Sequence, residues 1–241
     1  MSTETQSPKP QWGLLATALW SLAIYFVMAV VQGVVIIVYL RVTGSAPDAV
    51  GIMEAIEENG TVLALATLAG TTICAPMILG IAALKRGSIA DYLALKAPRP
   101  ATLVLLLVIT VVFIILNDLL TLSLGRDVVP PFMKATYASA DPLWLLWVAV
   151  ILCAPLLEEL FFRGFLFKGL EPVLTGTGAI IVSAALWAVI HTQYGLYEKT
   201  CIFVMGLLLG YARARTGSLV PPLLMHATAN LIATIEAAIV V

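Results

Sequence analysis

The stretch Pro142–Phe167, PLWLLWVAVILCAPLLEELFFRGFLF, is long and apolar enough to cross a membrane as a helix. Crossing the hydrocarbon core of a bilayer takes about 20 apolar residues. The stretch nevertheless carries Glu158, Glu159 and Arg163, and each ionisable side chain at membrane depth costs roughly 2.5–3.5 kcal/mol on insertion scales. A membrane helix that retains such residues indicates a functional site or a buried ion pair.

The composition of the whole chain also indicates a lipid environment. Of its 241 residues, 61% are hydrophobic and 11% are charged, against roughly 45–50% and 25% in soluble domains. A soluble domain of this size has too little interior to bury so much apolar surface. The formal net charge of −1 argues against nucleic acid, because phosphate binding needs a basic face. We therefore expect membrane lipid as a partner and no nucleic acid.

Six further apolar runs surround this stretch. The predicted spans are Trp12–Leu40, Thr61–Leu84, Ala101–Leu122, Pro142–Phe167, Gly178–His191, Thr200–Ala212 and Leu219–Val241. The runs lack the alternation of polar and apolar residues that is typical of membrane β-barrels. We predict an all-α, multi-pass transmembrane helical bundle of about seven helices, or eight if the first run is broken. Its single membrane domain comprises a polar tail (1–11), N-terminal helices (12–122) and a C-terminal core with the candidate site (142–241).

The distribution of Lys and Arg predicts the orientation of the bundle, because cytoplasmic loops of membrane proteins carry an excess of these residues. With the N-terminus inside, nine of them fall on the inner side and four on the outer side. The inner set is Lys9, Lys85, Arg86, Lys96, Arg99, Arg163, Lys168, Arg213 and Arg215, and the outer set is Arg41, Arg126, Lys134 and Lys199. We expect a protein of the cell membrane with a cytoplasmic N-terminus.

The two histidines of the chain, His191 and His226, also lie in apolar runs. At a rise of about 1.5 Å per residue from the predicted inner ends of their helices, Glu158, His191 and His226 all reach the middle of the bilayer. Asn230 follows His226 by one helical turn, so these two side chains share a face. We expect the four residues to meet in a polar cavity that opens toward the inner face.

Glu159 and Arg163 are separated by four residues, which is the spacing of an ion pair within one helix. A structural role for this pair leaves Glu158, about 100° further around the helix, without a cation in its own helix. Glu158 is therefore the carboxylate left for a functional site, with the histidines and Asn230 beside it.

Three motifs in this order, Glu158-Glu159-x-x-x-Arg163, Trp187-x-x-x-His191 and His226-x-x-x-Asn230, resemble those of the CPBP family. This family comprises CAAX prenyl endopeptidases and bacteriocin-processing relatives, also called Abi proteins. The resemblance covers about Leu143–Ile235. Trp187 stands where the family usually has Phe, and we expect the packing role of this aromatic ring to be kept.

The resemblance implies a membrane-embedded endopeptidase that cleaves a membrane-associated peptide or protein by intramembrane proteolysis. It implies that Glu158 and His191 activate a water molecule, while His226 and Asn230 face the developing oxyanion. Glu159 and Arg163, which follow Glu158 in the first motif, would support and orient Glu158. The family has also been described as metalloproteases on the basis of its motifs.

The sequence leaves the presence of a metal open. Glu158, His191 and His226 would offer three ligands to zinc or another divalent ion, with a fourth position for water. The chain lacks an HExxH motif, which would place two ligands one turn apart. A metal-free mechanism would use the same three residues.

Two alternatives to this interpretation remain at the level of sequence. Cys153 could act as a nucleophile with a histidine, although we expect all three cysteines, Cys74, Cys153 and Cys201, to be reduced and buried. The chain could also be a non-catalytic membrane protein that binds a peptide, such as a bacteriocin-immunity protein or a transporter. Many transporters have two matching halves, and this sequence shows no such repeat.

Overall fold

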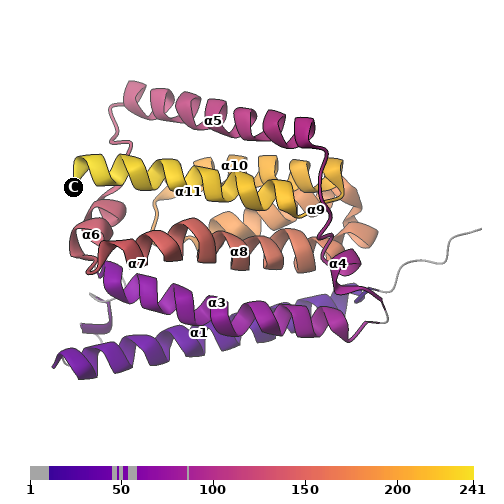
Figure 1. Cartoon of the computed structure of the whole chain (residues 1–241), viewed down its shortest axis with the longest axis horizontal. Coiled ribbons are helices and arrows are strands. Elements are labelled where there is room, and N and C mark those ends of the chain that lie inside the picture. The colour runs from indigo at the N-terminus through magenta and orange to yellow at the C-terminus, as the bar shows by residue number, and fades with distance from the viewer. Residues whose placement is uncertain (1–10, 45–47, 49–50, 54–58, 86) are drawn as a thin grey trace, which may run out of the picture.

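The computed structural model describes residues 11–44, 48, 51–53, 59–85 and 87–241. Regular structure in these residues is helical throughout, without a strand. Figure 1 shows the long helices lying side by side, with their axes roughly aligned. The prediction of an all-α membrane bundle is therefore confirmed. Of the predicted polar tail, residues 1–11, all but Gln11 lies outside the described residues.

The N-terminal part of the chain contributes long and short helices. They are α1 (Leu14–Thr43), α3 (Gly60–Ala83), α4 (Ile89–Tyr92), α5 (Pro100–Ser123) and α6 (Pro131–Ser139). The first apolar run forms a single unbroken helix, α1, so it does not supply an eighth span. α1 packs along α3, whereas α6 packs against the start of α3.

Capping residues explain where several of these helices begin and end. Asn59 accepts a hydrogen bond from the Val62 N–H at 3.0 Å through its side-chain oxygen, as N-cap residues do. Pro100 takes the first position of α5, where its missing N–H costs nothing. α1 ends at Gly44 with φ 77°, a left-handed conformation that glycine adopts without strain.

The middle of the chain forms one helical run of 48 residues, Leu143–Ile190. Along this run the structure changes from α7 (Leu143–Val148) to a π-helix, η1 (Ala149–Cys153), then to α8 (Ala154–Glu159), a second π-helix, η2 (Leu160–Leu166), and α9 (Phe167–Ile190). Thr175 interrupts α9 with a non-helical φ of 62° and ψ of 172°. The chain folds back there, so that α9 packs on η2. The fourth and fifth predicted spans therefore form one helical run with a sharp bend.

The last two helices, α10 (Leu196–Thr216) and α11 (Val220–Val240), complete the bundle. α10 packs closely on α9 because Gly206 has no side chain at their contact. A Cβ atom at Gly206 would lie 2.9 Å from the Ala184 Cβ atom, closer than two methyl groups can approach. Gly206 and Gly210 thus form a small-residue face of the kind that lets membrane helices approach one another.

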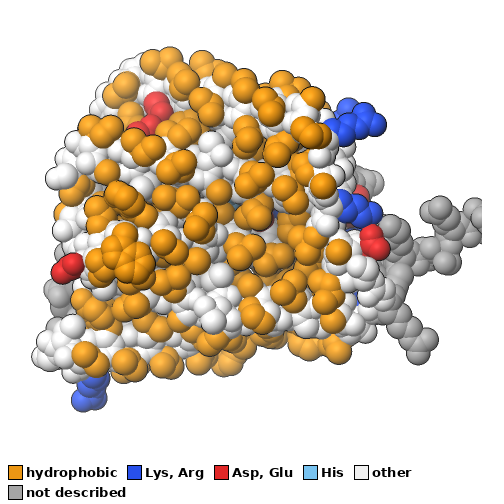
Figure 2. Space-filling model, in the orientation of Figure 1, with side chains coloured by type: hydrophobic (Ala, Val, Ile, Leu, Met, Phe, Trp, Pro, Cys, Tyr) orange, Lys and Arg blue, Asp and Glu red, His pale blue; other side chains and the backbone are white. Residues whose placement is uncertain are grey.

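The surface of the bundle fits a lipid environment. Within the described residues, five helical runs are long and apolar enough to cross a membrane: Leu14–Thr43, Gly60–Ala83, Pro100–Ser123, Leu143–Ile190 and Val220–Val240. The sixth predicted span lies on α10, which is not among the five and carries charged residues at both ends. Apolar side chains cover most of the face drawn in Figure 2. The protein is a multi-pass membrane protein.

The two ends of the bundle differ in charge. We call the end that carries Lys85, Lys96, Arg99 and Arg215 the basic end; Figure 2 shows Lys and Arg side chains gathered there, beside α4. The opposite end is formed by α6 and by the loops before α6 and α10, where Phe132 and Tyr194 pack edge to face with ring centroids 5.7 Å apart. These two ends define the position of the site described next.

Candidate active site

Glu158 and Glu159 lie in α8, between the two π-helical segments η1 and η2. In η1 the Ala154 N–H donates to the Ala149 carbonyl, five residues earlier. The next donor in this pattern would be Pro155, which has no N–H. π-Helical turns are rare and are often found at functional sites. Here they determine the directions in which the two carboxylates leave the helix.

Asn230 of α11 replaces the hydrogen bond that Pro155 cannot make. Its Nδ2 donates to the Val150 carbonyl oxygen at 2.7 Å. Val150 lies five residues before Pro155, so in a π-helical pattern its carbonyl would accept from the N–H that Pro155 lacks. An unsatisfied carbonyl away from water is costly, so this bond ties α11 to η1. The second N–H of the Asn230 amide remains free to donate toward the cavity described below.

Glu159 and Arg163 form the ion pair that the sequence predicts, and both side chains are fully buried. Arg163 Nη1 lies 2.8 Å from Glu159 Oε1, and Arg163 Nη2 donates to the Gly206 carbonyl at 3.2 Å. The close approach of α10 at Gly206 is what brings this carbonyl within reach. The pair therefore links α8 and η2 to α10 through buried polar groups.

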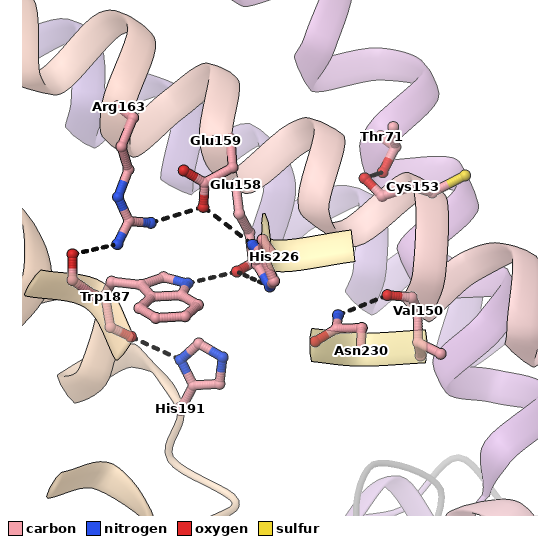
Figure 3. A network of polar contacts seen from close by, with 11 residues as sticks. Thr71, Val150, Cys153, Glu158, Glu159, Arg163, Trp187, His191, His226 and Asn230 are labelled. Atoms are coloured by element: carbon pink, nitrogen blue, oxygen red, sulfur yellow. Dashed lines mark hydrogen bonds and ion pairs between the residues drawn. The ribbon is translucent and has the colours of Figure 1, made fainter. Parts of the chain in front are cut away.

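His226 lies between the two glutamates and contacts both. Its Nδ1 is 3.0 Å from Glu159 Oε1, and since an ionised carboxylate only accepts hydrogen bonds, Nδ1–H is the donor. Its Nε2 is 4.0 Å from Glu158 Oε2. When His226 is neutral, this arrangement leaves the lone pair on Nε2, on the side of Glu158. Glu159 thus holds Arg163 and also orients His226 (Figure 3).

Trp187 of α9 connects Glu158 with His191. The indole N–H of Trp187 donates to Glu158 Oε2 at 2.5 Å, and the Trp187 carbonyl oxygen lies 2.6 Å from His191 Nδ1. A carbonyl only accepts, so His191 Nδ1 carries the proton and its Nε2 remains available. Figure 3 shows Trp187 between these two side chains, with His226 on the other side of Glu158.

The four predicted site residues, Glu158, His191, His226 and Asn230, line one cavity of about 580 Å³. They come from α8, from the end of α9 and from α11, so separate helices supply the wall of this cavity. Most of the remaining wall is apolar, and part of it comes from α1 and α5. The predicted convergence of these four residues on one cavity is therefore found in the structure.

The cavity extends toward the end opposite the basic end. We expected it to open toward the inner face, which is the basic end in the predicted orientation. The described residues that line it instead extend to the opposite end, where they include the exposed side chains of Asp127 and Gln193. The loops before α6 and α10, and not the loops at the basic end, continue the cavity wall. The inward opening stays a prediction, because it depends on which end of the bundle faces the cytoplasm.

The residues predicted to bind a metal are not gathered as a preformed three-ligand group. In the part of the chain that the structure describes, no group of three His, Cys, Asp or Glu side chains is arranged to hold an ion. Trp187 already occupies Glu158 Oε2, and His191 and His226 each direct Nδ1 to an oxygen acceptor. These contacts leave Glu158 Oε1 and the Nε2 atoms of both histidines for another ligand, so metal binding stays a prediction, and no step below depends on a metal.

The cysteines are free, as the sequence predicts, but of the three only Cys74 is buried, and Cys153 and Cys201 are partly exposed. Cys153 lies at the end of η1, and its carbonyl accepts a hydrogen bond from Thr71 Oγ1 at 3.2 Å. Among the residues that line the cavity in the described part of the chain, Cys153 is absent. A nucleophile must face the site of reaction, so this position does not favour Cys153 as a nucleophile.

Hydrogen bonds and ion pairs join all the motif residues except Asn230, which lines the same cavity and binds the Val150 carbonyl. These residues lie in a segment that matches a known protein family. Residues 140–232 match the family of type II CAAX prenyl endopeptidases, Rce1-like. This segment, which we call the Rce1-like segment, has nearly the same boundaries as the predicted resemblance and contains the four predicted site residues. The predicted resemblance to the CPBP family is confirmed over this segment.

The chain is also similar to a curated bacterial protein. The chain is 34% identical over 106 residues to an uncharacterized 24.3 kDa protein of Escherichia coli, an alignment that covers 42% of this chain and 48% of that protein. The chain thus spans about half the length of this relative. No solved structure matches the chain.

Two contacts of the site were not predicted from the sequence. We expected Trp187 only to pack, yet its N–H binds Glu158, and we expected Glu159 only to bind Arg163, yet it also binds His226. The first contact could have been anticipated from the residue type, because a buried Trp usually finds an acceptor for its N–H. The second depends on how α11 lies against α8, which the sequence does not specify.

We predict that Asn230→Ala lowers both stability and activity. Loss of the bond to the Val150 carbonyl leaves a polar group unsatisfied, which costs about 1–3 kcal/mol of unfolding free energy. The family resemblance also implies that the second amide N–H donates to the oxyanion, and loss of such a donor slows cleavage by about 10²–10³-fold. Thermal unfolding in detergent and the turnover of a membrane peptide would measure the two effects.

Thr71→Val is the matched control, because it also removes a side-chain bond to an η1 carbonyl, at Cys153, but outside the cavity. We expect Thr71→Val to lower the melting temperature while leaving cleavage near the wild-type rate. Equal cleavage by Asn230→Ala and Thr71→Val would show that Asn230 only joins helices.

Proposed function

We propose that the protein is an intramembrane endopeptidase that hydrolyses a peptide bond of a membrane-associated substrate. The observation that carries the proposal is the placement of Glu158, His191, His226 and Asn230 on one cavity of about 580 Å³ inside a bundle of membrane helices. The match of residues 140–232 to a family of endopeptidases supports the same reaction class.

In the proposed mechanism Glu158 is the general base. A water molecule bound by Glu158 and by the free Nε2 of His191 gives a proton to the Glu158 carboxylate as its oxygen attacks the carbonyl carbon of the substrate. The C–N bond then breaks, and the proton passes from Glu158 to the nitrogen of the leaving amine. The products are a new carboxyl group and a new amino group, so the step balances as a hydrolysis.

Asn230 and His226 stabilise the oxyanion in this mechanism. The second N–H of Asn230 is not used by Val150 and donates toward the cavity. When His226 is protonated, both of its nitrogens donate, so that Nδ1–H remains bound to Glu159 and Nε2–H faces the oxyanion. The buried Glu159–Arg163 pair keeps His226 in this position.

The substrate in this proposal is a peptide anchored in the membrane, and the resemblance favours prenylated peptides with a CAAX terminus. A direct test incubates the purified protein in lipid vesicles with two tagged peptides of one sequence, one farnesylated and one anchored by a single transmembrane helix. Mass spectrometry of the fragments would identify any cleaved bond. Peptide that is bound but remains uncut would support a non-catalytic binding protein instead.

We also propose that the basic end faces the cytoplasm, together with the N-terminus. Lys96, Arg99 and Arg215 are exposed at this end, in agreement with the excess of positive charge on the cytoplasmic side of membrane proteins. A reporter fused after residue 90, between α3 and α5, is expected to be active in the cytoplasm. A reporter after residue 125, in the loop before α6, is the matched control and should report the outer side; reversed signals would contradict this orientation.

A further inference from the structure

Trp187 is in contact with nearly every polar group of the site. Only 3% of its surface is exposed, its N–H donates to Glu158 Oε2 at 2.5 Å, and its ring packs edge to face against His191 and His226 at centroid distances of 5.3 and 5.1 Å. The guanidinium carbon of Arg163 lies 4.6 Å from the centroid of the same ring. These contacts indicate that Trp187 orients polar groups of the site in addition to packing against them.

We propose that Trp187 is a positioning residue that holds the Glu158 carboxylate in the orientation needed to accept the proton from water. The proposal rests on the proposed function and adds a residue to it. The last torsion of a Glu side chain is soft and broadly distributed, so a carboxylate that borders a cavity rotates unless a donor holds it. Here the Trp187 N–H holds Oε2, which leaves Oε1 for the water.

Arg163 strengthens this donor through the indole ring. Its positive charge lies over the ring face, where a cation attracts the electron density of the π system. This attraction makes the N–H at the ring edge more positive and its bond to a carboxylate stronger. Arg163 is itself fixed by Glu159 and by the Gly206 carbonyl. Trp187 therefore joins the buried ion pair to the general base.

The contribution of the side chain can be separated from that of the backbone. His191 binds the carbonyl of residue 187, and this bond persists with any residue at that position. Trp187→Phe consequently keeps the His191 contact and most of the ring packing, but removes the one N–H that binds Glu158. The effect of this substitution on catalysis therefore reports mainly the Glu158 contact.

We expect Trp187→Phe to lower kcat by up to about 100-fold, because a misplacement of about 1 Å at a reacting group can cost this much, while KM remains unchanged. Trp12→Phe is the matched control, because it also removes one indole hydrogen bond, to the Ile81 carbonyl at 3.2 Å, but at the basic end. Trp12→Phe should leave kcat unchanged. A kcat of Trp187→Phe equal to that of Trp12→Phe would overturn the proposal.

A spectroscopic measurement tests the contact independently of cleavage. The Raman band of an indole ring that reports N–H hydrogen bonding should shift between the wild type and Glu158→Leu, which removes the acceptor, and the shifted band should be missing in Trp187→Phe. An unshifted band would overturn the proposal even if Trp187→Phe failed to fold. If the wild type cuts no peptide, the proposed function fails, and the band shift still decides whether Trp187 holds Glu158.

Discussion

Glu158→Gln is expected to lower the rate of peptide cleavage by about 10²–10⁴-fold, the usual effect of losing a general base, while the protein remains folded. The amide oxygen of Gln can still accept the hydrogen bond from Trp187, but it cannot take a proton from water. Glu158 also lies outside the buried ion pair, and its side chain is 25% exposed to the cavity. Turnover and melting temperature in detergent should be measured on the same preparations.

Glu171→Gln offers a matched control for this prediction. It makes the same chemical change at an exposed glutamate outside the cavity, so turnover should stay at the wild-type value. The melting temperature should fall slightly, because the charge of Glu171 acts on the buried Arg213. Cleavage by Glu158→Gln at the rate of this control would remove Glu158 from the role of base.

Glu159→Gln is expected to act mainly on stability. Glu159 and Arg163 are both 0% exposed, and removing the charge of one partner leaves the other buried without compensation. Losses of this kind cost about 3–5 kcal/mol of unfolding free energy. Because Glu159 also binds His226, we expect slower cleavage as well. Denaturation in mixed micelles would measure the free energy of unfolding.

The double variant Glu159→Gln/Arg163→Met tests the cause of the loss. It removes both charges and fills the volume of Arg163 with an apolar side chain, which often restores stability when a buried ion pair is replaced. We expect it to be more stable than Glu159→Gln alone. A double variant as unstable as Glu159→Gln would mean that packing at position 163, and not the unpaired charge, causes the loss.

The helices of this protein could be predicted from sequence because lipid allows few alternatives to them. Apolar runs that cross a bilayer must satisfy their backbone hydrogen bonds internally, and the predicted spans accordingly lie on α1, α3, α5 and the helices of the C-terminal core. The start of the fifth span near Gly178 was also close to the bend at Thr175. Glu158 and the two histidines lie at similar depths along their predicted helices, and for this reason we predicted that they meet.

The finer geometry depends on contacts between helices, which the periodicity of one helix does not contain. The π-helical pattern near Pro155 and its completion by Asn230 require that α11 lie against η1. The opening of the cavity depends on the path of the loops at the end opposite the basic end. The bond from Trp187 to Glu158 depends on how far α9 folds back. Each of these features follows from tertiary packing.

The central claim is that Glu158 activates water for hydrolysis of a membrane peptide. The most direct measurement incubates one tagged membrane peptide in ¹⁸O-labelled water with the purified wild type, Glu158→Gln and Cys153→Ala, and analyses the fragments by mass spectrometry. We predict that the wild type and Cys153→Ala produce a fragment with ¹⁸O in its new carboxyl group, and that Glu158→Gln produces almost none. Equal cleavage by the wild type and Glu158→Gln, with Cys153→Ala inactive, would contradict the claim.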